Sequence, residues 1–389
     1  MEPVTFLVFD AFMGDGVART TANLANQLSL TRKVRVISLY RSQRRPRFEL
    51  ADGIELTALR DRRRLWSRLL LRLPRRPSRL SPNPSPRTMS ARTDHLLSRA
   101  IRAIPDGVVV STRPSLHQAL TTWAPAHLRT VGWDHLNFAA RMGRPEVQGA
   151  LRAALPKLDA FVVLTDADAA DYRREFADAR PSVAVIRNAL SWPVTDQVLP
   201  LDTQVVVSAG RLVARKGCKR LVRAFASAAK EVPDWRLRIH GEGRQRGEIE
   251  ELVRTLGVTD RVQLPGYCPD LPAALRDGSV FAMASKSEGF PMVLIEAMSC
   301  GLPPIAFDCP RGPGEIIRHE HNGLLVPNGD QRRYVAELRR LLTDPALRRR
   351  LGDEARRDAE QYSPQRIVGD WDALFERLET RAERQEPGR

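Results

Sequence analysis

Short apolar runs alternate with helical patterns along the chain, and this alternation constrains the fold more than any other feature. At the N-terminal end, Val4–Asp10 predicts a buried strand, Val17–Leu30 an amphipathic helix and Val34–Leu39 a second strand. Strands that alternate with helices pair in parallel, because each helix returns the chain to the end of the sheet where it started. Further strands are expected at residues 108–111, 130–132, 160–165 and 183–186.

The same alternation starts again after an interruption at 191–201, where Pro193 and Pro200 break the pattern. The chain has 389 residues, which is too many for one ordinary core and suits two. We therefore expect an α/β protein with two doubly wound domains, at 1–195 and 196–362, and a C-terminal helix and tail at 363–389. Ligands of such sheets bind at the carboxyl ends of the strands. In the second half, strands are expected at 204–209, 237–241, 262–264, 280–284 and 304–307, and helices at 218–230, 292–300, 313–318 and 331–342.

Targeting and redox features are sparse. No run approaches the roughly 18–20 apolar residues of a membrane-spanning helix. The N-terminus lacks the basic start and long apolar middle of a signal peptide, which favours a cytoplasmic location. The four cysteines show no CxxC spacing, so we expect neither a disulfide framework nor a zinc site.

The positive charge is unevenly placed along the chain. The formal net charge is +16, and residues 41–93 alone hold 15 Arg against 4 acidic residues. Such a local excess indicates an anionic partner, namely a membrane, a nucleic acid or a phosphorylated substrate. An Arg-rich overall composition also contributes, since only six of the 62 basic residues are Lys.

Residues 60–93 form an Arg- and Pro-rich segment that interrupts the alternation and predicts a mobile loop. Within it, Asp61–Arg76 combines several Leu and Trp66 with seven arginines in the pattern of a basic amphipathic helix. Such a helix could lie peripherally on the anionic inner face of the cell membrane. The alternative is a helix that packs its Leu face on the N-terminal domain.

Three loops between a strand and a helix carry residues suited to ligand binding. The first contains Gly14-Asp15-Gly16, where Gly16 lets a ligand approach the start of the following helix. The third glycine of a dinucleotide fingerprint is absent, so an ordinary turn is the alternative. The second loop runs from Gly210 to Gly217 and places Arg211 and Lys216 at a carboxyl strand end, where two cations suit a pyrophosphate. Solvated surface charge is the alternative there.

The third loop is the most informative. Glu288 and Glu296 are separated by seven residues, and Pro291 between them suits the first turn of a helix. Backbone N–H groups near Gly289 and Phe290 would face a phosphate at the helix start. A carboxylate in the apolar helix around Glu296 needs a partner, for which ligand hydroxyl groups or a nearby Arg are the candidates.

These motifs together resemble the donor domain of the retaining glycosyltransferases of family 4. The resemblance rests on Gly210-Arg211…Lys216-Gly217 and on Glu288-Gly-Phe-Pro-x4-Glu296-Ala-Met, and it continues into Gly-Pro-Gly-Glu-Ile-Ile at 312–317 and Asn-Gly-Leu-Leu-Val-Pro at 322–327. It covers roughly residues 200–370 strongly and the N-terminal half weakly. The resemblance implies a GT-B fold, with two facing Rossmann-like domains and a cleft between them.

The resemblance also implies roles for individual residues. The N-terminal domain would bind the acceptor and the C-terminal domain a nucleotide-sugar donor, with UDP as the expected nucleotide and no metal or other cofactor. One departure is that the first loop lacks the acidic-basic pair that often follows its glycines in this family, which leaves the acceptor side open. The resemblance implies that Arg211 and Lys216 bind the donor diphosphate, that Glu296 binds the ribose and that Tyr267 lies beside the nucleobase. It implies that Glu288 binds the transferred sugar, that Gly289 and Phe290 add backbone contacts and that Gly16 approaches the donor phosphate. It also implies that His135 lies near the reacting sugar, and a purely structural role is the alternative for this histidine.

The expected function is transfer of a sugar to an acceptor hydroxyl in the synthesis of a cell-envelope polysaccharide, glycolipid or related glycan. Glycosylation of a small molecule or natural product, and a nucleotide-sugar epimerase on the same fold, are close alternatives. A nucleic-acid-binding protein that uses the Arg-rich segment would explain the charge but not the second half, so no nucleic-acid partner is expected. Asp166-Ala-Asp168 matches a DxD metal motif superficially, but acidic residues at this position are typical of a helix start.

Overall fold

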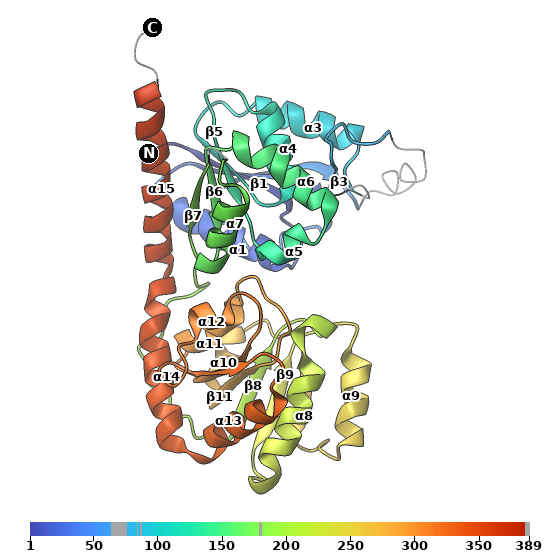
Figure 1. Ribbon diagram of the computed structural model, residues 1–389, viewed down its shortest axis with the longest axis vertical. Helices are drawn as coiled ribbons and strands as arrows, with labels where there is room; N and C mark the ends of the chain where they lie inside the picture. The colour runs from blue at the N-terminus through green and yellow to red at the C-terminus, as the bar shows by residue number, and fades with distance from the viewer. Residues whose placement is uncertain (64–75, 84, 86–87, 179–180, 386–389) are drawn as a thin grey trace. The chain divides into compact units, whose positions relative to one another are not determined.

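The computed structural model describes residues 1–63, 76–83, 85, 88–178 and 181–385. These residues form two compact units (Figure 1). Unit 1 consists of residues 1–191 together with the C-terminal segment from Pro364 onward, and unit 2 consists of residues 192–363.

Unit 1 is built on a parallel seven-stranded sheet of order β3-β2-β1-β4-β5-β6-β7. All seven residues of the central strand β1 are buried, as expected for a parallel strand with both faces covered. Because the strands are parallel, their carboxyl ends lie along one edge of the sheet. The strands are β1 (Val4–Asp10), β2 (Val34–Arg41), β3 (Glu55–Asp61), β4 (Val108–Ser111), β5 (Arg129–Trp133), β6 (Ala160–Val163) and β7 (Ser182–Val185).

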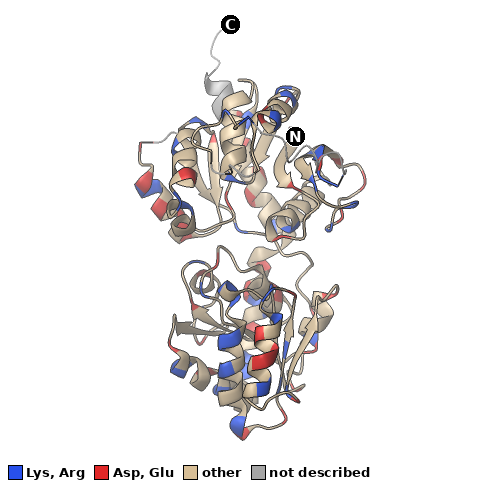
Figure 2. Cartoon of the chain, turned by 90° about the vertical axis from the view of Figure 1, so that its right-hand side faces the viewer, with Lys and Arg blue, Asp and Glu red and all other residues tan. Residues whose placement is uncertain are grey.

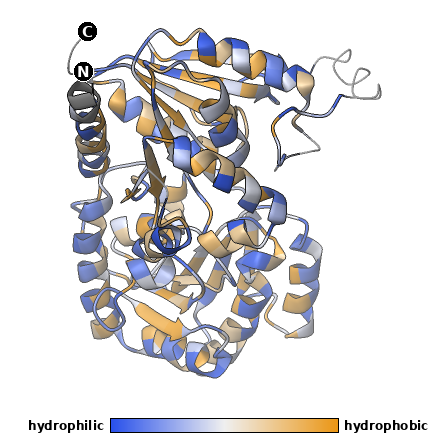
Figure 3. Ribbon diagram, turned by 45° about the horizontal axis from the view of Figure 1, so that its top comes forward, coloured by the Kyte–Doolittle hydropathy of each residue, from blue (hydrophilic) through white to orange (hydrophobic). Residues whose placement is uncertain are grey.

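Helices that are apolar on one side cover this sheet. Figure 3 shows hydrophobic and hydrophilic residues alternating around these helices, whereas the strands are mainly hydrophobic. One core cluster joins Leu7 of β1 and Phe161 of β6 to Leu97, Leu116 and Leu151 of three helices. The helices of unit 1 are α1 (Gly16–Leu28), α3 (Ala91–Arg102), α4 (Pro114–Trp123), α5 (Phe138–Met142), α6 (Pro145–Ala154), the 3₁₀ turn η1 (Leu155–Lys157), α7 (Asp166–Glu175) and α15 (Pro364–Gln385).

The C-terminal helix α15 packs within unit 1. Trp371 lies edge-on to Trp133 with ring centroids 5.1 Å apart, and both side chains are fully buried. Arg32, just after α1, forms an ion pair with Asp372 and lies over the Phe375 ring. The last helix therefore completes the core of the first unit.

Unit 2 contains a second parallel sheet, of order β10-β9-β8-β11-β12-β13. Its core joins the strands to α8, α9 and α13, with Phe225 and Tyr334 among the buried aromatic side chains. The strands are β8 (Val205–Ala209), β9 (Arg236–His240), β10 (Val262–Gly266), β11 (Val280–Met283), β12 (Pro304–Asp308) and β13 (Leu324–Pro327). The helices are η2 (Ala214–Lys216), α8 (Cys218–Ala228), η3 (Ala229–Glu231), α9 (Arg246–Thr255), α10 (Leu271–Arg276), α11 (Met292–Ser299), α12 (Pro313–Ile316), α13 (Gln331–Thr343), α14 (Pro345–Ala359) and η4 (Glu360–Tyr362).

The predicted α/β class with two doubly wound sheets is confirmed, and the elements that flank the loop predicted at about 60–93 overlap its bounds by two or three residues. Arg60 and Asp61 end strand β3, which pairs in parallel with β2, and α3 begins at Ala91. Strand β3 is half-exposed and contains Glu55 and Thr57, so it lacks the continuous apolar run that marks a buried strand. The predicted helix over Asp61–Arg76 falls almost entirely on residues 64–75, outside the described residues, and its first residue belongs to β3.

Basic residues are spread over both units. Figure 2 shows Lys and Arg on helices and loops of each unit. Among the described residues, no helix is long and apolar enough to cross a membrane.

Candidate active site

The loop between β8 and α8 is held against the neighbouring strand β11 by a glycine. Gly217 has a φ of +68°, and a Cβ atom built on it would lie 1.9 Å from the carbonyl oxygen of Ala284. Only glycine fits such a position, since a side chain would be both strained and in collision. This close approach brings Lys216 beside the loop that follows β11.

Lys216 and Glu288 form an ion pair at the carboxyl ends of two adjacent strands. The Lys216 ammonium donates to Oε1 of Glu288 at 2.7 Å, and the Glu288 side chain is almost completely buried. Arg215 donates to the carbonyl oxygen of Ser287 at 2.8 Å and lies 3.4 Å from Oε2 of Glu288. The structure thus brings two predicted site residues together and adds Arg215, which was not among the residues predicted from the sequence.

Arg211 is placed differently from Lys216. Its side chain is exposed and makes no hydrogen bond or ion pair with any residue that the structure describes. An exposed guanidinium keeps all five of its N–H donors available to a ligand or to water. Lys216 therefore has a partner within the protein, Glu288, whereas Arg211 lies on the surface of the same loop.

The loop from Glu288 leads into helix α11. The prediction that Pro291 occupies the first helical turn is wrong by one residue, since it is the N-cap of a helix that begins at Met292. Gly289 and Phe290 are buried, and the Phe290 ring packs edge-on to Tyr362 at 5.8 Å. Gly312 approaches from the other side, where a Cβ atom would lie 2.5 Å from Cδ of Pro291. The segment between the two glutamates is thus firmly packed.

Glu296 lies about one turn inside α11 and is 1% exposed. Its neighbours in the helix are apolar, and a carboxylate in such surroundings is expensive unless its oxygens are hydrogen-bonded. Tyr267, by contrast, follows β10 and is 56% exposed. Lys216, Glu288 and the N-termini of α8 and α11 therefore lie at the carboxyl ends of β8 and β11, with Glu296 about one turn further along α11. Such an arrangement suits a ligand with phosphate and hydroxyl groups.

In unit 1, Gly16 is the first residue of α1, and the Asp15 side chain caps this helix by accepting from the N–H of Ala18 at 2.9 Å. A Cβ atom built on Gly16 would meet nothing within 4 Å. Packing within the protein therefore does not require glycine here. Open space beside a helix start is compatible with close approach of an anion.

His135 lies just after β5, against the Trp133 ring at 4.2 Å between centroids. Its Nε2 atom is shielded from solvent and has no hydrogen-bond partner among the described residues. Burial lowers the pKa of His135 to about 3, although the Asp134 carboxylate acts in the opposite direction. The imidazole is therefore neutral at pH 7 and offers a hydrogen bond rather than a charge.

The neighbouring Asp134 anchors the segment that carries His135. Its fully buried carboxylate accepts hydrogen bonds from the Arg141 guanidinium and from the Tyr172 hydroxyl, the latter at 3.0 Å. Burial alone would raise the pKa of Asp134, but Arg141 outweighs it and the net pKa is lowered. This network was not predicted from the sequence, in which its only signal is an Asp beside the histidine.

The prediction that Asp166 and Asp168 begin a helix is confirmed. Helix α7 starts at Asp166, and Thr165 caps it by accepting from the N–H of Asp168. Asp168 also accepts from the N–H of Phe138 at 2.9 Å, and Asp166 pairs with Arg187 at 2.7 Å. Within the described part of the chain, no three His, Cys, Asp or Glu side chains are grouped so that they could hold a metal ion.

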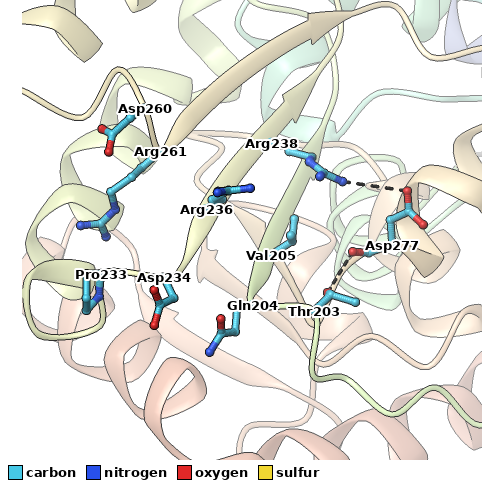
Figure 4. Close-up of a pocket in the computed structure, with 10 residues that line it drawn as sticks. All are labelled: Thr203, Gln204, Val205, Pro233, Asp234, Arg236, Arg238, Asp260, Arg261 and Asp277. Carbon is cyan, nitrogen blue, oxygen red and sulfur yellow. Dashed lines mark hydrogen bonds and ion pairs between the residues drawn. The ribbon is translucent and has the colours of Figure 1, made fainter.

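A hollow of about 610 Å³ lies elsewhere in unit 2, at the amino ends of its strands. Its lining includes Val205 and Arg236, which begin β8 and β9, and Asp277, which precedes β11 (Figure 4). Arg238 lies 3.9 Å from Asp277, and Thr203 donates to the Asp277 carbonyl oxygen at 2.9 Å. This hollow is at the opposite end of the sheet from Lys216 and Glu288, so it is not the predicted donor site.

Comparison of the sequence with known proteins gives matches in glycan synthesis. Residues 195–358 match the model of the family described as glycosyl transferases group 1. An exopolysaccharide phosphotransferase of Streptomyces coelicolor is 30% identical over 389 residues, which cover 97% of this chain but 41% of that protein. The lipopolysaccharide core biosynthesis glycosyltransferase LpsD of Rhizobium meliloti is 36% identical over 205 residues, or 52% of this chain and 56% of that one. The chain thus spans only about half of these relatives.

Solved structures with the same fold cover nearly the whole chain. TarM aligns with a TM-score of 0.77 and 14% identity, over 96% of this chain and 99% of that one. The pneumococcal O-GlcNAc transferase GtfA, solved with UDP and GlcNAc, aligns with a TM-score of 0.76 and 15% identity, over 97% and 99% of the two chains. The two parallel sheets therefore have the GT-B fold. The family match itself lies within unit 2.

Proposed function

We propose that this protein transfers a sugar from a UDP-sugar to an acceptor hydroxyl group, with retention of anomeric configuration, in the synthesis of a cell-surface polysaccharide or lipopolysaccharide. The observation that carries this proposal is the pairing of Lys216 with Glu288 beside the start of α11. It falls within the segment that matches the family. The polysaccharide and lipopolysaccharide roles of the relatives support the choice of pathway class.

In this reaction the bond between the anomeric carbon and the donor phosphate oxygen breaks, and the acceptor oxygen bonds to the same carbon. Negative charge develops on the leaving UDP. Lys216, with one N–H donated to Glu288 and two remaining, would stabilise that charge together with the N–H groups at the start of α11. The leaving phosphate would accept the proton of the acceptor hydroxyl.

The other predicted residues take supporting roles. Glu296 would bind the ribose hydroxyls, Glu288 the hydroxyls of the transferred sugar and Tyr267 the nucleobase. Arg211 would add a second cation at the diphosphate, because its exposed guanidinium is in the same loop as Lys216. In unit 1, neutral His135 would donate or accept a hydrogen bond at the reacting sugar, and Gly16 would approach the donor phosphate.

A panel of UDP-, GDP- and ADP-sugars tests the donor, with binding followed by saturation-transfer NMR on the full chain. Selective binding of one UDP-sugar, lost in Lys216→Ala, is the expected result. Failure of every UDP-sugar to bind would contradict the proposal. Conversion of the bound sugar without any acceptor would instead indicate an epimerase. We also propose that no metal is required, so activity retained after chelation with EDTA is expected.

A further inference from the structure

Three arginines at the carboxyl ends of neighbouring strands in unit 1 lie over aromatic rings, and we name these three the arginine cluster. Their guanidinium groups are close enough to the ring centroids for cation–π attraction, which acts within about 6 Å. A guanidinium held against a ring also loses rotamer freedom before any ligand arrives, so less entropy is lost on binding. The three pairs are Arg113 over Phe9 at 4.2 Å, Arg62 over Tyr40 at 4.8 Å and Arg41 over Phe12 at 5.1 Å.

The rings beneath the cluster form a firm base. Phe9, Phe12 and Tyr40 are each at most 8% exposed, and Phe9 meets Tyr40 edge-on with centroids 5.1 Å apart. The Tyr40 hydroxyl also donates to the carbonyl oxygen of Thr88. Each guanidinium group of the cluster therefore rests on a buried aromatic ring that is held in place by its own contacts.

All three arginines lie at the ligand-binding edge of the sheet. Arg41 ends β2, Arg62 directly follows β3, and Arg113 follows β4 as the N-cap of α4. Strands β3, β2, β1 and β4 are consecutive neighbours in the sheet, so their carboxyl ends lie side by side. Open α/β sheets bind their ligands outside this edge.

The cluster has no counter-ion within the described chain. None of the three guanidinium groups forms an ion pair there, and Arg41 donates only to the backbone oxygens of Gln43 and Arg44. Arg113 is partly buried, and this burial lowers the pKa of its guanidinium group.

The carboxylates that act electrostatically on the cluster are engaged with other groups. Asp15, which acts on Arg113, caps α1, and Asp61, which acts on Arg41, forms an ion pair with Arg63 at 2.6 Å. Asp10 acts on both Arg62 and Arg113; its Oδ1 atom accepts from the N–H of Phe12 at 3.0 Å, and its buried Oδ2 atom has no hydrogen-bond partner among the described residues. Among the residues that the structure describes, the three cations thus remain without a close anionic partner at this edge.

We propose that the arginine cluster binds an anionic group of the acceptor, so that the acceptor is a phosphorylated or carboxylated glycan and not a neutral one. This inference rests on the proposed function, in which unit 1 binds the acceptor. Guanidinium forks match the paired oxygens of phosphate and carboxylate groups, and Arg62 and Arg113 reach the edge from strands on either side of β1 and β2.

Methyl phosphate and sodium glucuronate serve as probes, because they represent the phosphate and carboxylate groups separately. Each is titrated by NMR into the full chain at low salt, with and without saturating UDP to occupy the donor site. Binding in the presence of UDP, weakened at least about tenfold in Arg62→Ala and in Arg113→Ala, is the expected result. Arg113→Lys keeps the charge and loses the fork, so an intermediate affinity is expected.

Arg99→Ala is the matched control, since Arg99 is an exposed arginine of α3 in the same unit. It should bind both the probe and UDP as the unmodified chain does. Preference for one probe assigns the group as phosphate or carboxylate. If UDP binds but neither probe does, or if the cluster variants bind the probes unchanged, the inference is overturned while the proposed function stands. Failure of UDP to bind would contradict the proposed function, and the titration without UDP would still decide the cluster.

Discussion

Lys216 donates to Glu288 at 2.7 Å across two strands that are neighbours in the sheet but separated by 72 positions in the sequence. The pair depends on Gly217, whose lack of a side chain lets the β8–α8 loop approach β11. A cation and a carboxylate are thereby placed side by side, and they would bind different ligand groups, one anionic and one neutral. The Lys216 ammonium suits a phosphate, and the Glu288 carboxylate suits sugar hydroxyls.

Lys216→Ala should abolish most of the donor affinity. It removes the cation expected at the leaving diphosphate, and loss of such a charge lowers turnover by roughly 100-fold or more. The almost buried Glu288 would also lose one of its partners, so the free energy of unfolding should fall by about 1–3 kcal/mol. Calorimetric titration with UDP measures the affinity, an assay of sugar transfer measures the turnover, and urea unfolding measures the stability.

Lys219→Ala is the control, because Lys219 forms an exposed ion pair with Glu248 at 2.6 Å on the adjoining helix. An exposed pair contributes only about 0–1 kcal/mol, and UDP affinity should be unchanged. Equal UDP affinities for the two variants would refute the role given to Lys216.

Glu296→Gln tests the ribose contact with a side chain of nearly the same shape. Loss of a charged hydrogen-bond acceptor should weaken UDP binding about tenfold or more, measured as the dissociation constant. Glu337→Gln on α13 is the control, since Glu337 is also a largely buried glutamate on a helix but pairs with Arg340. A Glu296→Gln protein that binds UDP as tightly as the Glu337→Gln protein would remove Glu296 from the donor site.

Gly217→Ala should destabilise unit 2 by about 2–4 kcal/mol, because it combines a left-handed backbone with a collision. Gly247→Ala is its counterpart. A Cβ atom there meets nothing within 4 Å, and Gly247 lies in the first turn of α9, so alanine should stabilise by about 0.5–1 kcal/mol. Urea unfolding midpoints that shift in the same direction for both variants would contradict the special role of Gly217.

His117 should make the protein sensitive to acid. Its ring is fully buried, with Nδ1 2.7 Å from the Ser111 hydroxyl, and burial lowers its pKa from 6.5 to about 3. The unfolded chain therefore binds a proton that the folded chain excludes between those pH values, so stability falls as pH falls. The contribution lost between pH 7 and pH 5 is about 2 kcal/mol.

The free energy of unfolding, measured with urea, should fall between pH 7 and pH 5 by about 2 kcal/mol less in His117→Asn than in the unmodified chain. The variant should be less stable than the unmodified chain at pH 7, because it disturbs a packed site. Parallel pH profiles for the two proteins would show that His117 does not titrate on unfolding.

Much of the architecture was predictable because local patterns specify it. The segments around Val4–Asp10 and Cys218–Ala228 were placed within a few residues, since each has a continuous apolar run or stripe bounded by turn residues. Strand β3 was missed because an edge strand needs no such run. The roles of His135 and Gly16 remain predictions, because neither position makes a contact that distinguishes a functional from a structural residue.

The sequence alone determined the fold class and the two glutamates with their spacing, because these depend on periodicity and on residues that are close in the chain. Tertiary structure alone decided which charges meet. Parallel strands bring loops that are distant in the sequence to one edge of the sheet. Lys216 therefore lies beside Glu288, and the guanidinium groups of Arg41, Arg62 and Arg113 lie over three buried rings. Charge interactions fall off with distance in space and not along the chain, and for that reason they could not be predicted from sequence order.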